Sequence, residues 1–412
     1  MFQLTDAHAL TDDLRRLRRT LHQEPELGLH LPRTQTTVLA ALDGLPLEIT
    51  TGTALSSVTA VLRGGRPGPA VLLRADMDAL PVQETTGLPY ASRHPGAMHA
   101  CGHDLHVSAL VGAARLLAER RDDLAGDVVL MFQPGEEGHG GARLMIDEGV
   151  LDAAGRRVVA AYALHVLANT LPAGVVATRP GTVLAASDGF DVTVTGRGGH
   201  GSSPHTAQDP ITVVCEMVTA LQTMVTRTVD VFDPAVLTVG SLHAGDARNV
   251  IPETATFRAT VRTVSETVRA QVREAVLRTV RGIADAHGVR ADVDYQDGYP
   301  VTVNDPAETA FATGVAEQLL GPGRTLLAPQ PISGSEDFSY VLERVPGAFL
   351  GVGACPADRA PATAPMNHSP DASFDDGVLP VAAALLANLA AGRLRRAAAD
   401  RRPGGETAAV TP

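Results

Sequence analysis

Apolar residues in the first part of the chain follow two alternating spacings. Leucines three and four residues apart over Leu10–Leu21 predict a helix, and the same period returns over 106–124. Runs rich in valine, alanine and leucine at 56–64, 68–78 and 160–166 predict strands, and the second run is continuous enough to be buried on both faces. Strands that alternate with helices are typical of an α/β domain, whose helices cover the faces of its sheet.

The pattern changes near Ala186. A strand, a helix, two strands, a long helix and a final strand follow over 189–298, and the long helix opens at Ser265 and Glu266, which are typical of a helix N-terminus. The order βαββαβ predicts a ferredoxin-like domain inserted into the α/β domain. We therefore expect a first part of the α/β domain (1–185), the inserted domain (186–297), a second part of the α/β domain (298–396) and a disordered tail (397–412).

Composition narrows the class of protein. The chain has 412 residues and a formal net charge of −12, which argues against nucleic acid as a partner because phosphate binding needs clustered Lys and Arg. The three cysteines are too few and too scattered for a disulfide framework, which favours a reducing cytoplasm. The N-terminal residues do not resemble a signal peptide, and no stretch approaches the ~20 apolar residues of a membrane helix. We expect a cytoplasmic protein without membrane contact.

Two short segments concentrate polar residues with metal-binding chemistry. In "MHACGHDLH" (Met98–His106), Cys101 and His103 suit a borderline-soft divalent ion, although a loop that merely collects polar residues also explains them. In "QPGEEGHGG", Glu136 and Glu137 end a strand. Adjacent carboxylates point different ways, so one can bind metal while the other takes a proton from water. Taken alone, an exposed acidic turn explains this pair better.

Further candidates follow other strands of the α/β pattern. His165 closes a strand, His368 lies in a loop before the last helix, and Asp76 and Asp78 end the run at 68–78. Asp78 could hydrogen-bond a ligand histidine and orient it. Each residue has an ordinary structural explanation on its own. Together they lie after successive strands, at the edge where α/β sheets place their sites.

The motifs as a set resemble a known family. Over Leu14–Ala390 the chain is similar to the amidohydrolase branch of the aminoacylase/carboxypeptidase superfamily, which includes hippurate hydrolases, N-acyl-amino-acid amidohydrolases and indole-acetyl-amino-acid hydrolases. The motifs, in the order the family has them, are RADMDALPVQE, MHACGHDLH, QPGEEGHGGA, ALHV, GRGGHGSSPH, NVIPETATFRATVR, GSEDFS and NHSPDASF.

The resemblance implies a mixed-sheet, dinuclear-metal hydrolase domain and a role for each matching residue. Glu136 matches the general base that takes a proton from metal-activated water. The two ions could be zinc, manganese, cobalt or nickel. Five positions match the family's metal ligands: Cys101, His103, Glu137, His165 and His368.

The resemblance also gives the inserted domain a role, as a lid and as the contact between the two chains of a homodimer. His200 matches a histidine that reaches the neighbouring subunit's active site and stabilises the oxyanion. Asn249 and Arg262 match positions that hold the substrate's carboxylate. His139 departs from the family's small residues after the paired glutamates, and we assign it no role.

The implied reaction is hydrolysis of the amide bond of an N-acyl amino acid, with an acetyl, benzoyl or aryl-acetyl group, to a carboxylic acid and a free amino acid. One alternative is a dipeptidase, a carboxypeptidase or a deacetylase of a biosynthetic intermediate in the same superfamily. The Cys-Gly-His motif argues against these branches, which place an aspartate at the bridging position. Another alternative is a non-catalytic metal- or metabolite-binding protein, which the presence of Glu136 disfavours.

Overall fold

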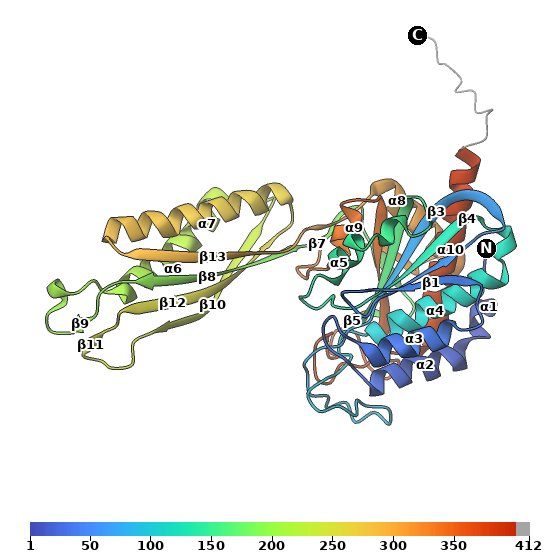
Figure 1. Ribbon diagram of the computed structural model, residues 1–412, viewed down its shortest axis with the longest axis horizontal. Helices are drawn as coiled ribbons and strands as arrows, with labels where there is room; N and C mark the ends of the chain where they lie inside the picture. The colour runs from blue at the N-terminus through green and yellow to red at the C-terminus, as the bar shows by residue number, and fades with distance from the viewer. Residues whose placement is uncertain (401–412) are drawn as a thin grey trace, which may run out of the picture. The chain divides into compact units, whose positions relative to one another are not determined.

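The computed structural model describes residues 1–400 of the chain, which divide into two compact units (Figure 1). The first unit comprises Met1–Gly181, Val303–Pro329 and the described residues from Tyr340 onward. The second comprises Thr182–Thr302 together with Gln330–Ser339. The second unit is therefore an insertion in the first.

The unit boundaries differ from the expected ones. The second unit begins at Thr182 and its first segment ends at Thr302, instead of the expected 186 and 297. Residues 330–339, expected in the α/β domain, belong to the second unit, where Ile332 donates to the carbonyl of Val183 (2.9 Å) and accepts from the N–H of Ala185 (3.1 Å). This segment contacts the second unit through backbone hydrogen bonds, and such contacts cannot be predicted from the pattern of hydrophobic residues. Residues 397–400, expected in the tail, continue the last helix, and 401–412 lie outside the described residues.

The first unit is built on one mixed sheet of eight strands. β3, β4, β5 and β16 run parallel to one another, while β1, β2 and the β6–β15 pair complete the edges with antiparallel contacts. β4 is buried along its whole length, as expected of a strand covered on both faces. In sheet order the strands are β1 (Leu47–Thr51), β2 (Val58–Leu62), β4 (Ala125–Gln133), β3 (Arg66–Asp76), β5 (Val158–Pro172), β16 (Gly347–Cys355), β6 (Val176–Thr178) and β15 (Thr325–Leu327).

Helices cover this sheet, and two of them form much of its core. α4 and α10 pack on each other and on β3, and both are rich in fully buried alanine and leucine. With no tryptophan in the chain, small aliphatic residues fill the space between the helices and the sheet. The helices are α1 (Leu4–His8), α2 (Thr11–Gln23), α3 (Pro32–Leu42), α4 (His103–Glu119), α5 (Gly141–Asp147), α8 (Pro306–Leu320), α9 (Ser339–Leu342) and α10 (Leu379–Asp400).

The last helix is more apolar than we expect from the sequence, where no stretch approaches the length of a membrane helix. The helical segment Asp376–Ala399 is long and apolar enough to cross a membrane by length and composition, the single such helix in the described part of the chain. However, 78% of its apolar window is buried inside the fold. The segment is therefore the core helix of the first unit, and its composition reflects burial between α4 and the sheet.

The second unit has the predicted ferredoxin-like order. Its strands form an antiparallel sheet in the order β10-β12-β8-β13, and β8 alternates strictly between buried and half-buried residues. Asp209 caps α6 and Ser265 caps α7, as the sequence indicates for the second helix. The elements are β8 (Ala186–Thr195), α6 (Pro210–Thr228), β10 (Ala235–Ala244), β12 (Thr254–Thr263), α7 (Glu266–His287) and β13 (Arg290–Tyr299), with a ribbon of β9 (Gly199–His200) and β11 (Val250–Ile251). The segments β7 (Gly181–Leu184) and β14 (Thr302–Asn304) lie where the chain passes between the units.

Strand direction in the first unit determines where a site can form. The carboxyl ends of β3, β4, β5 and β16 lie at one edge of the sheet because these strands are parallel. The polar residues that follow them in sequence are therefore brought together at that edge.

Candidate metal centre

All five predicted metal ligands lie together in the first unit. Cys101 belongs to the loop before α4, His103 is the first residue of α4, His165 lies on β5, Glu137 follows β4 and His368 follows β16. Cys101, His103 and His165 offer donor atoms within 4.8 Å of one another, as do Cys101, Glu137 and His368. Each ligand comes from a different element, so the group exists only in the folded chain.

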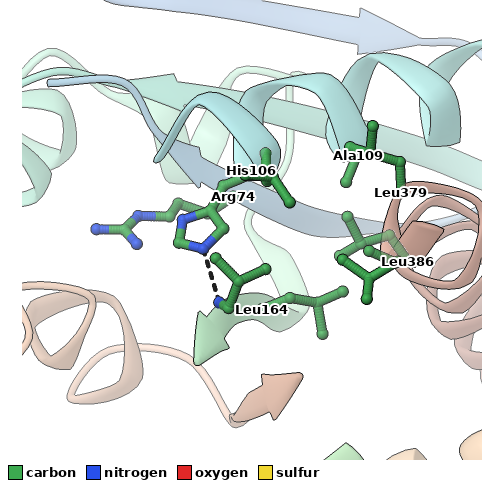
Figure 2. A pocket seen from close by; sticks show the side chains of 10 residues that line it. Arg74, His106, Ala109, Leu164, Leu379 and Leu386 are labelled. Carbon is green, nitrogen blue, oxygen red and sulfur yellow. Dashed lines mark hydrogen bonds between the residues drawn. The ribbon is translucent and has the colours of Figure 1, made fainter. Parts of the chain in front are cut away.

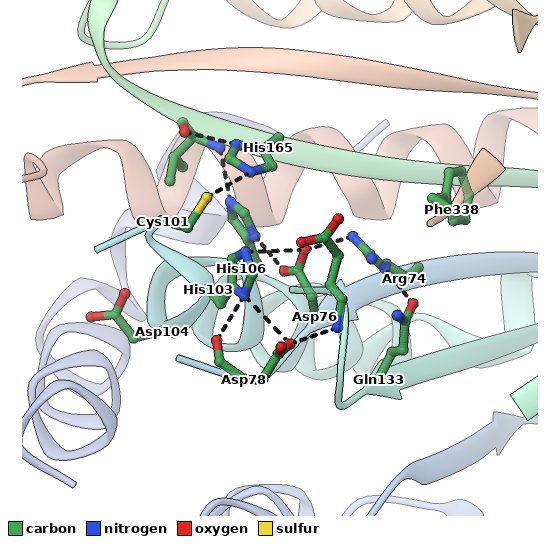
Figure 3. Close-up of polar contacts among 12 residues, drawn as sticks. Arg74, Asp76, Asp78, Cys101, His103, Asp104, His106, Gln133, His165 and Phe338 are labelled. Atoms are coloured by element: carbon green, nitrogen blue, oxygen red, sulfur yellow. Dashed lines mark hydrogen bonds and ion pairs between the residues drawn. The ribbon is translucent and has the colours of Figure 1, made fainter. Parts of the chain in front are cut away.

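The cysteine sulfur lies at the middle of this group. Cys101 Sγ is 3.3 Å from His165 Nε2 (Figure 3) and 3.3 Å from His368 Nε2. Glu137 Oε1 is 3.3 Å from His368 Nε2 and 4.0 Å from His103 Nε2. A single sulfur thus belongs to two donor sets.

Two residues in left-handed conformations shape the loops that carry the donors. Gly102, between Cys101 and His103, has φ +85°, and a Cβ atom there would lie 2.4 Å from Val166 Cγ2. His368 has φ +72° and is the single non-glycine residue with positive φ in the described chain. Its N–H donates to the carbonyl of Ala100 (2.9 Å), which holds the strained loop against the Cys101 segment.

Asn367 secures the same loop from the other side. Its Nδ2 donates to the carbonyls of Cys101 (3.2 Å) and Val166 (3.0 Å), and its Oδ1 accepts from the N–H of Ala168 (2.9 Å). One side chain therefore links the loop of His368 to the backbone beside Cys101 and His165.

Asp78 hydrogen-bonds the predicted ligand His103, as expected, and does so through its backbone carbonyl. The carbonyl oxygen of Asp78, and not its carboxylate, accepts a hydrogen bond from His103 Nδ1 at 2.8 Å, which leaves Nε2 for a metal ion. The carboxylate oxygens of Asp78 instead accept the backbone N–H groups of Glu136 (2.9 Å) and Glu137 (3.0 Å). One residue thus aligns both a histidine and the paired glutamates.

The electrostatics favour a cation in this position. Burial alone would raise the pKa of the Cys101 thiol, but the imidazoles of His165 and His103 hold that pKa well below its usual value. Against the effect of burial, the Cys101 thiolate raises the pKa of His165 to about 9. Hydrogen bonds to Cys101 and Glu137 raise the pKa of His368 to about 10. Protons on the imidazoles occupy positions that a metal ion can take.

The donor set fits a divalent metal ion. His103 Nε2 is buried and makes no hydrogen bond to the described residues, an arrangement that is costly unless another partner is bound. Thiolate, imidazole and carboxylate are together the ligands of zinc and its neighbours in the first transition row. Glu136 is buried beside this group, with a carboxylate oxygen within 4.8 Å of donors of His103 and Glu137.

Several buried polar residues behind the donors received no role from the sequence. Asp76 and His106 contact each other, and Arg74 and Gln133 extend the contact along β3 and β4 (Figure 3). The position of His106 three residues after His103 on a helix could have signalled a shared face. Its partners could not have been identified from the sequence, because they lie on other strands.

A cavity of about 10 Å³ lies behind this layer, between α4, β5 and α10 (Figure 2). Arg74 and His106 line its polar side, and Leu164, Leu379 and Leu386 are among the residues of its apolar side. The space is no larger than one water molecule needs, so it is a packing defect and not a substrate pocket.

The remaining predicted residues lie in the second unit, at its two ends. His200 and Asn249 are exposed near the β9–β11 ribbon, where the N–H of Gly201 donates to the carbonyl of Asn249 (2.8 Å). Arg262 is half-buried and donates to Ser335 Oγ at 3.1 Å.

The register of the sheet shows how far apart these ends are. Arg262 pairs with Ser187 at the start of β8, whereas His200 follows Thr195 at its end. The strand between Ser187 and Thr195 spans about 26 Å at about 3.3 Å per residue. Arg262 and His200 of one chain are therefore too far apart to contact the same small molecule.

The hydrogen bonds of His200 fix its tautomer. Its Nδ1 accepts from the backbone N–H of Ser202 at 3.2 Å, so in the neutral ring the proton is on Nε2.

His139 is exposed in the turn after the paired glutamates, and nothing in its surroundings gives it a function.

Comparison with known proteins identifies the family of the chain. The model of Peptidase family M20/M25/M40 matches residues 72–392. The chain belongs to this family. Family membership, together with its amidohydrolase and deacetylase relatives, makes the protein a metal-dependent hydrolase.

Similar proteins cover nearly the whole chain. N-acetyl-L-cysteine deacetylase of Bacillus subtilis is 40% identical over 337 residues (82% of this chain, 79% of that protein), and IAA-amino acid hydrolase ILR1-like 4 of Arabidopsis thaliana is 38% identical over 378 residues (91% and 84%). Thermostable carboxypeptidase 2 of Saccharolobus solfataricus is 36% identical over 389 residues (93% and 96%). The structure of the Bacillus subtilis YXEP protein, described as a dinuclear metal binding peptidase, aligns with a TM-score of 0.81 at 32% identity, over 94% of this chain and 99% of that one.

The low pKa of Cys101 predicts a thiolate in the metal-free protein. In chelator-treated protein at about pH 6, an ordinary thiol with a pKa of about 8.5 is protonated. At this pH we nevertheless expect the ultraviolet absorbance of a thiolate in the wild-type protein, and we expect it to be absent from Cys101→Ser. Cys355→Ser is the matched control, because burial raises the pKa of Cys355. An absorbance difference for Cys101→Ser that develops only in alkaline solution would contradict this electrostatic picture.

Proposed function

We propose that the protein hydrolyses the amide bond of N-acyl amino acids, releasing a carboxylic acid and a free amino acid, with two divalent metal ions per subunit. The observation that carries this proposal is the group of Cys101, His103 and Glu137, with Glu136 buried beside it. The relatives named for N-acetyl-cysteine and indole-acetyl-amino-acid hydrolysis support an acetyl or aryl-acetyl group as the acyl part, and we retain benzoyl as a further candidate.

Cys101, His103, Glu137, His165 and His368 would hold the ions, with Cys101 shared between them. Zinc, manganese, cobalt and nickel all suit these ligands. When bound, the ions supply Lewis acidity that polarises a carbonyl and lowers the pKa of a water molecule. The protonated imidazoles of the metal-free site must lose their protons on binding, so metal affinity should fall in acid.

Glu136 is the proposed general base. Its backbone N–H is fixed by Asp78, and its carboxylate lies beside the donors without being needed as a ligand. From there it can take a proton from the attacking water and pass that proton to the leaving amine. The neighbouring Glu137 is a proposed metal ligand instead. Asp78 also accepts its backbone N–H, and its carboxylate lies next to His368.

His200 and Arg262 are proposed to act on different substrate molecules. The Nε2–H of His200 is a donor suited to the oxyanion that forms when the amide carbonyl is attacked. Arg262, with Asn249 as a further candidate, would hold the substrate's carboxylate. Because the two ends of β8 separate His200 from Arg262, a homodimer in which each chain's second unit donates His200 to its partner's site accounts for both roles.

Related reactions are the main alternative. A carboxypeptidase or dipeptidase activity on the same ions is favoured by the relative named as a carboxypeptidase. The Cys-Gly-His donors, in place of an aspartate at the bridging position, still favour the amidohydrolase reaction.

We also propose the cytoplasm as the location, because Cys101, Cys215 and Cys355 are all free thiols.

The experiment that tests the proposal measures amino-acid release from N-acetyl, N-benzoyl and indole-acetyl amino acids, with dipeptides as the competing class. Chelator-treated protein is assayed first, then with zinc, manganese, cobalt and nickel added separately. We expect release only with metal, and faster from the N-acyl amino acids. Faster release from dipeptides would support the alternative, and no release with metal bound would contradict the proposed substrates.

Glu136→Gln should lower turnover by about 10²–10⁴-fold, the usual contribution of general acid–base catalysis. Its metal content should remain at the wild-type level, because the base is not a ligand. Glu137→Gln is the matched control, since it should lose metal together with activity. Metal analysis and turnover are measured on the same samples, and loss of metal from Glu136→Gln would assign that residue a ligand role instead.

Mixing two inactive variants tests the exchange of His200. Glu136→Ala and His200→Ala should each be inactive alone. After dissociation and reassociation in equal amounts, about a quarter of the sites would combine an intact Glu136 with an intact His200 from the partner chain. Recovery of activity near that fraction is expected, and no recovery in a mixture shown to contain mixed dimers would place His200 in its own chain's site.

A further inference from the structure

A continuous line of buried polar side chains runs behind the metal donors. It consists of Gln133, Arg74, Asp76 and His106, all of them at most 3% exposed. Gln133 Oε1 accepts from Arg74 Nε (2.8 Å), and Arg74 Nη1 donates to Asp76 Oδ2 (2.6 Å). Asp76 Oδ1 is 2.5 Å from His106 Nδ1 (Figure 3). The line therefore connects β4, β3 and α4.

The line ends on the backbone of β5, next to a proposed metal ligand. His106 Nε2 accepts a hydrogen bond from the N–H of Val166 at 2.8 Å. Val166 directly follows His165, whose ring centroid is 4.7 Å from that of His106. The pairing of β3 with β5 has already ended at Arg74 and Ala163. Beyond that point the imidazole of His106 satisfies a strand N–H that β3 does not reach.

These contacts determine the proton positions on His106. A backbone N–H can only donate, so Nε2 is the acceptor and Nδ1 carries the proton that Asp76 accepts. Both nitrogens of His106 and both carboxylate oxygens of Asp76 are then used by protein partners. Asp76, His103 and His106 do offer donor atoms within 4.8 Å of one another. A metal ion bound there would have to break these hydrogen bonds, so a third ion site is not the best account of the cluster.

Asp76 also lies beside the other histidine of α4. Its Oδ2 is 3.5 Å from His103 Nε2, while Arg74 shares the same oxygen. Asp76 thus contacts His106 directly and lies next to His103, one turn apart on α4. Its carboxylate fixes the separation between the first turn of α4 and the end of β3.

We propose that His106, held by Asp76, is a positioning residue for the metal ligand His165. The Asp76 carboxylate orients the ring of His106, and that ring holds the Val166 N–H, so that His165 Nε2 stays 3.3 Å from Cys101 Sγ. Neither residue binds metal. This inference rests on the proposed function, because it takes the site to bind two ions. It gives a role to His106 and Asp76, which are not among the proposed ligands.

Two amide substitutions separate the two hydrogen bonds of His106. In His106→Gln the side-chain carbonyl can reach the Nε2 position and accept from Val166, while the bond to Asp76 is lost. In His106→Asn the amide can reach the Nδ1 position and donate to Asp76, while the Val166 N–H is left unbonded. If His106 acts through Val166, only the second variant should lose metal strongly.

The measurement is metal affinity and stoichiometry by competition with a chelator of known affinity, using zinc and cobalt. We expect His106→Asn to bind one of its two ions about 10–100-fold more weakly, and His106→Gln to stay much closer to the wild type. The cobalt-loaded His106→Asn protein should also show an altered sulfur-to-cobalt charge-transfer band, because His165 and Cys101 share that ion. A purely structural role would change the stability of the metal-free protein without changing either readout.

Ser108→Ala is the matched control on the same helix. Its hydroxyl is buried and donates to the carbonyl of Asp104 at 2.8 Å, so its loss disturbs α4 without touching Val166. Asp76→Asn is a second test that keeps the shape of the side chain, and it should weaken the same ion if His106→Asn fails to fold.

The outcomes separate a failure of the positioning role from a failure of the metal centre. Wild-type affinity in His106→Asn and Asp76→Asn, or equal losses in His106→Asn and Ser108→Ala, would overturn the positioning role while leaving the metal centre in place. A wild-type protein that binds no divalent ion would overturn the proposed function and this inference with it.

Discussion

The contacts of Cys101 with His165 and His368 impose the strictest geometric requirement in the first unit. Both histidines must place Nε2 3.3 Å from one sulfur, although they come from β5 and from a loop after β16. Parallel pairing of β3, β4, β5 and β16 brings these segments to one edge. Gly102, in its left-handed conformation, then allows the loop before α4 to approach Val166 closely enough. The buried α10 and the small residues around it serve the same end, because they fix α4 against the sheet.

Much of this arrangement could be predicted from the sequence, and the missing parts share one physical cause. The alternating strands and helices, the βαββαβ order and the grouping of Cys101, His103 and Glu137 all follow from local patterns or from motif order. The role of the Asp78 carbonyl, the contact of His106 with the Val166 N–H and the joining of 330–339 to the second unit do not. These features depend on backbone N–H and C=O groups, which nearly every residue carries, so the identity of the side chains does not reveal them.

The second unit separates His200 from Arg262, and so their proposed roles, by the length of one strand. A ferredoxin-like sheet is rigid, since its two helices and the alternating apolar face of β8 form a core of their own. Residues at opposite ends of β8 therefore cannot be brought together by small adjustments. In the proposed dimer this rigidity would be useful, because each chain would hold one substrate with Arg262 and complete another active site with His200.

The charge state of Cys101 has a further consequence for the lifetime of the protein. A thiolate is oxidised far more readily than a thiol, first to a sulfenic acid and then irreversibly to sulfinic and sulfonic acids. The neighbouring imidazoles keep Cys101 as a thiolate when no metal ion is bound to it. Loss of metal would then be the first step of permanent inactivation by peroxide. The endurance of the protein in an oxidising environment would depend on how slowly its ions leave.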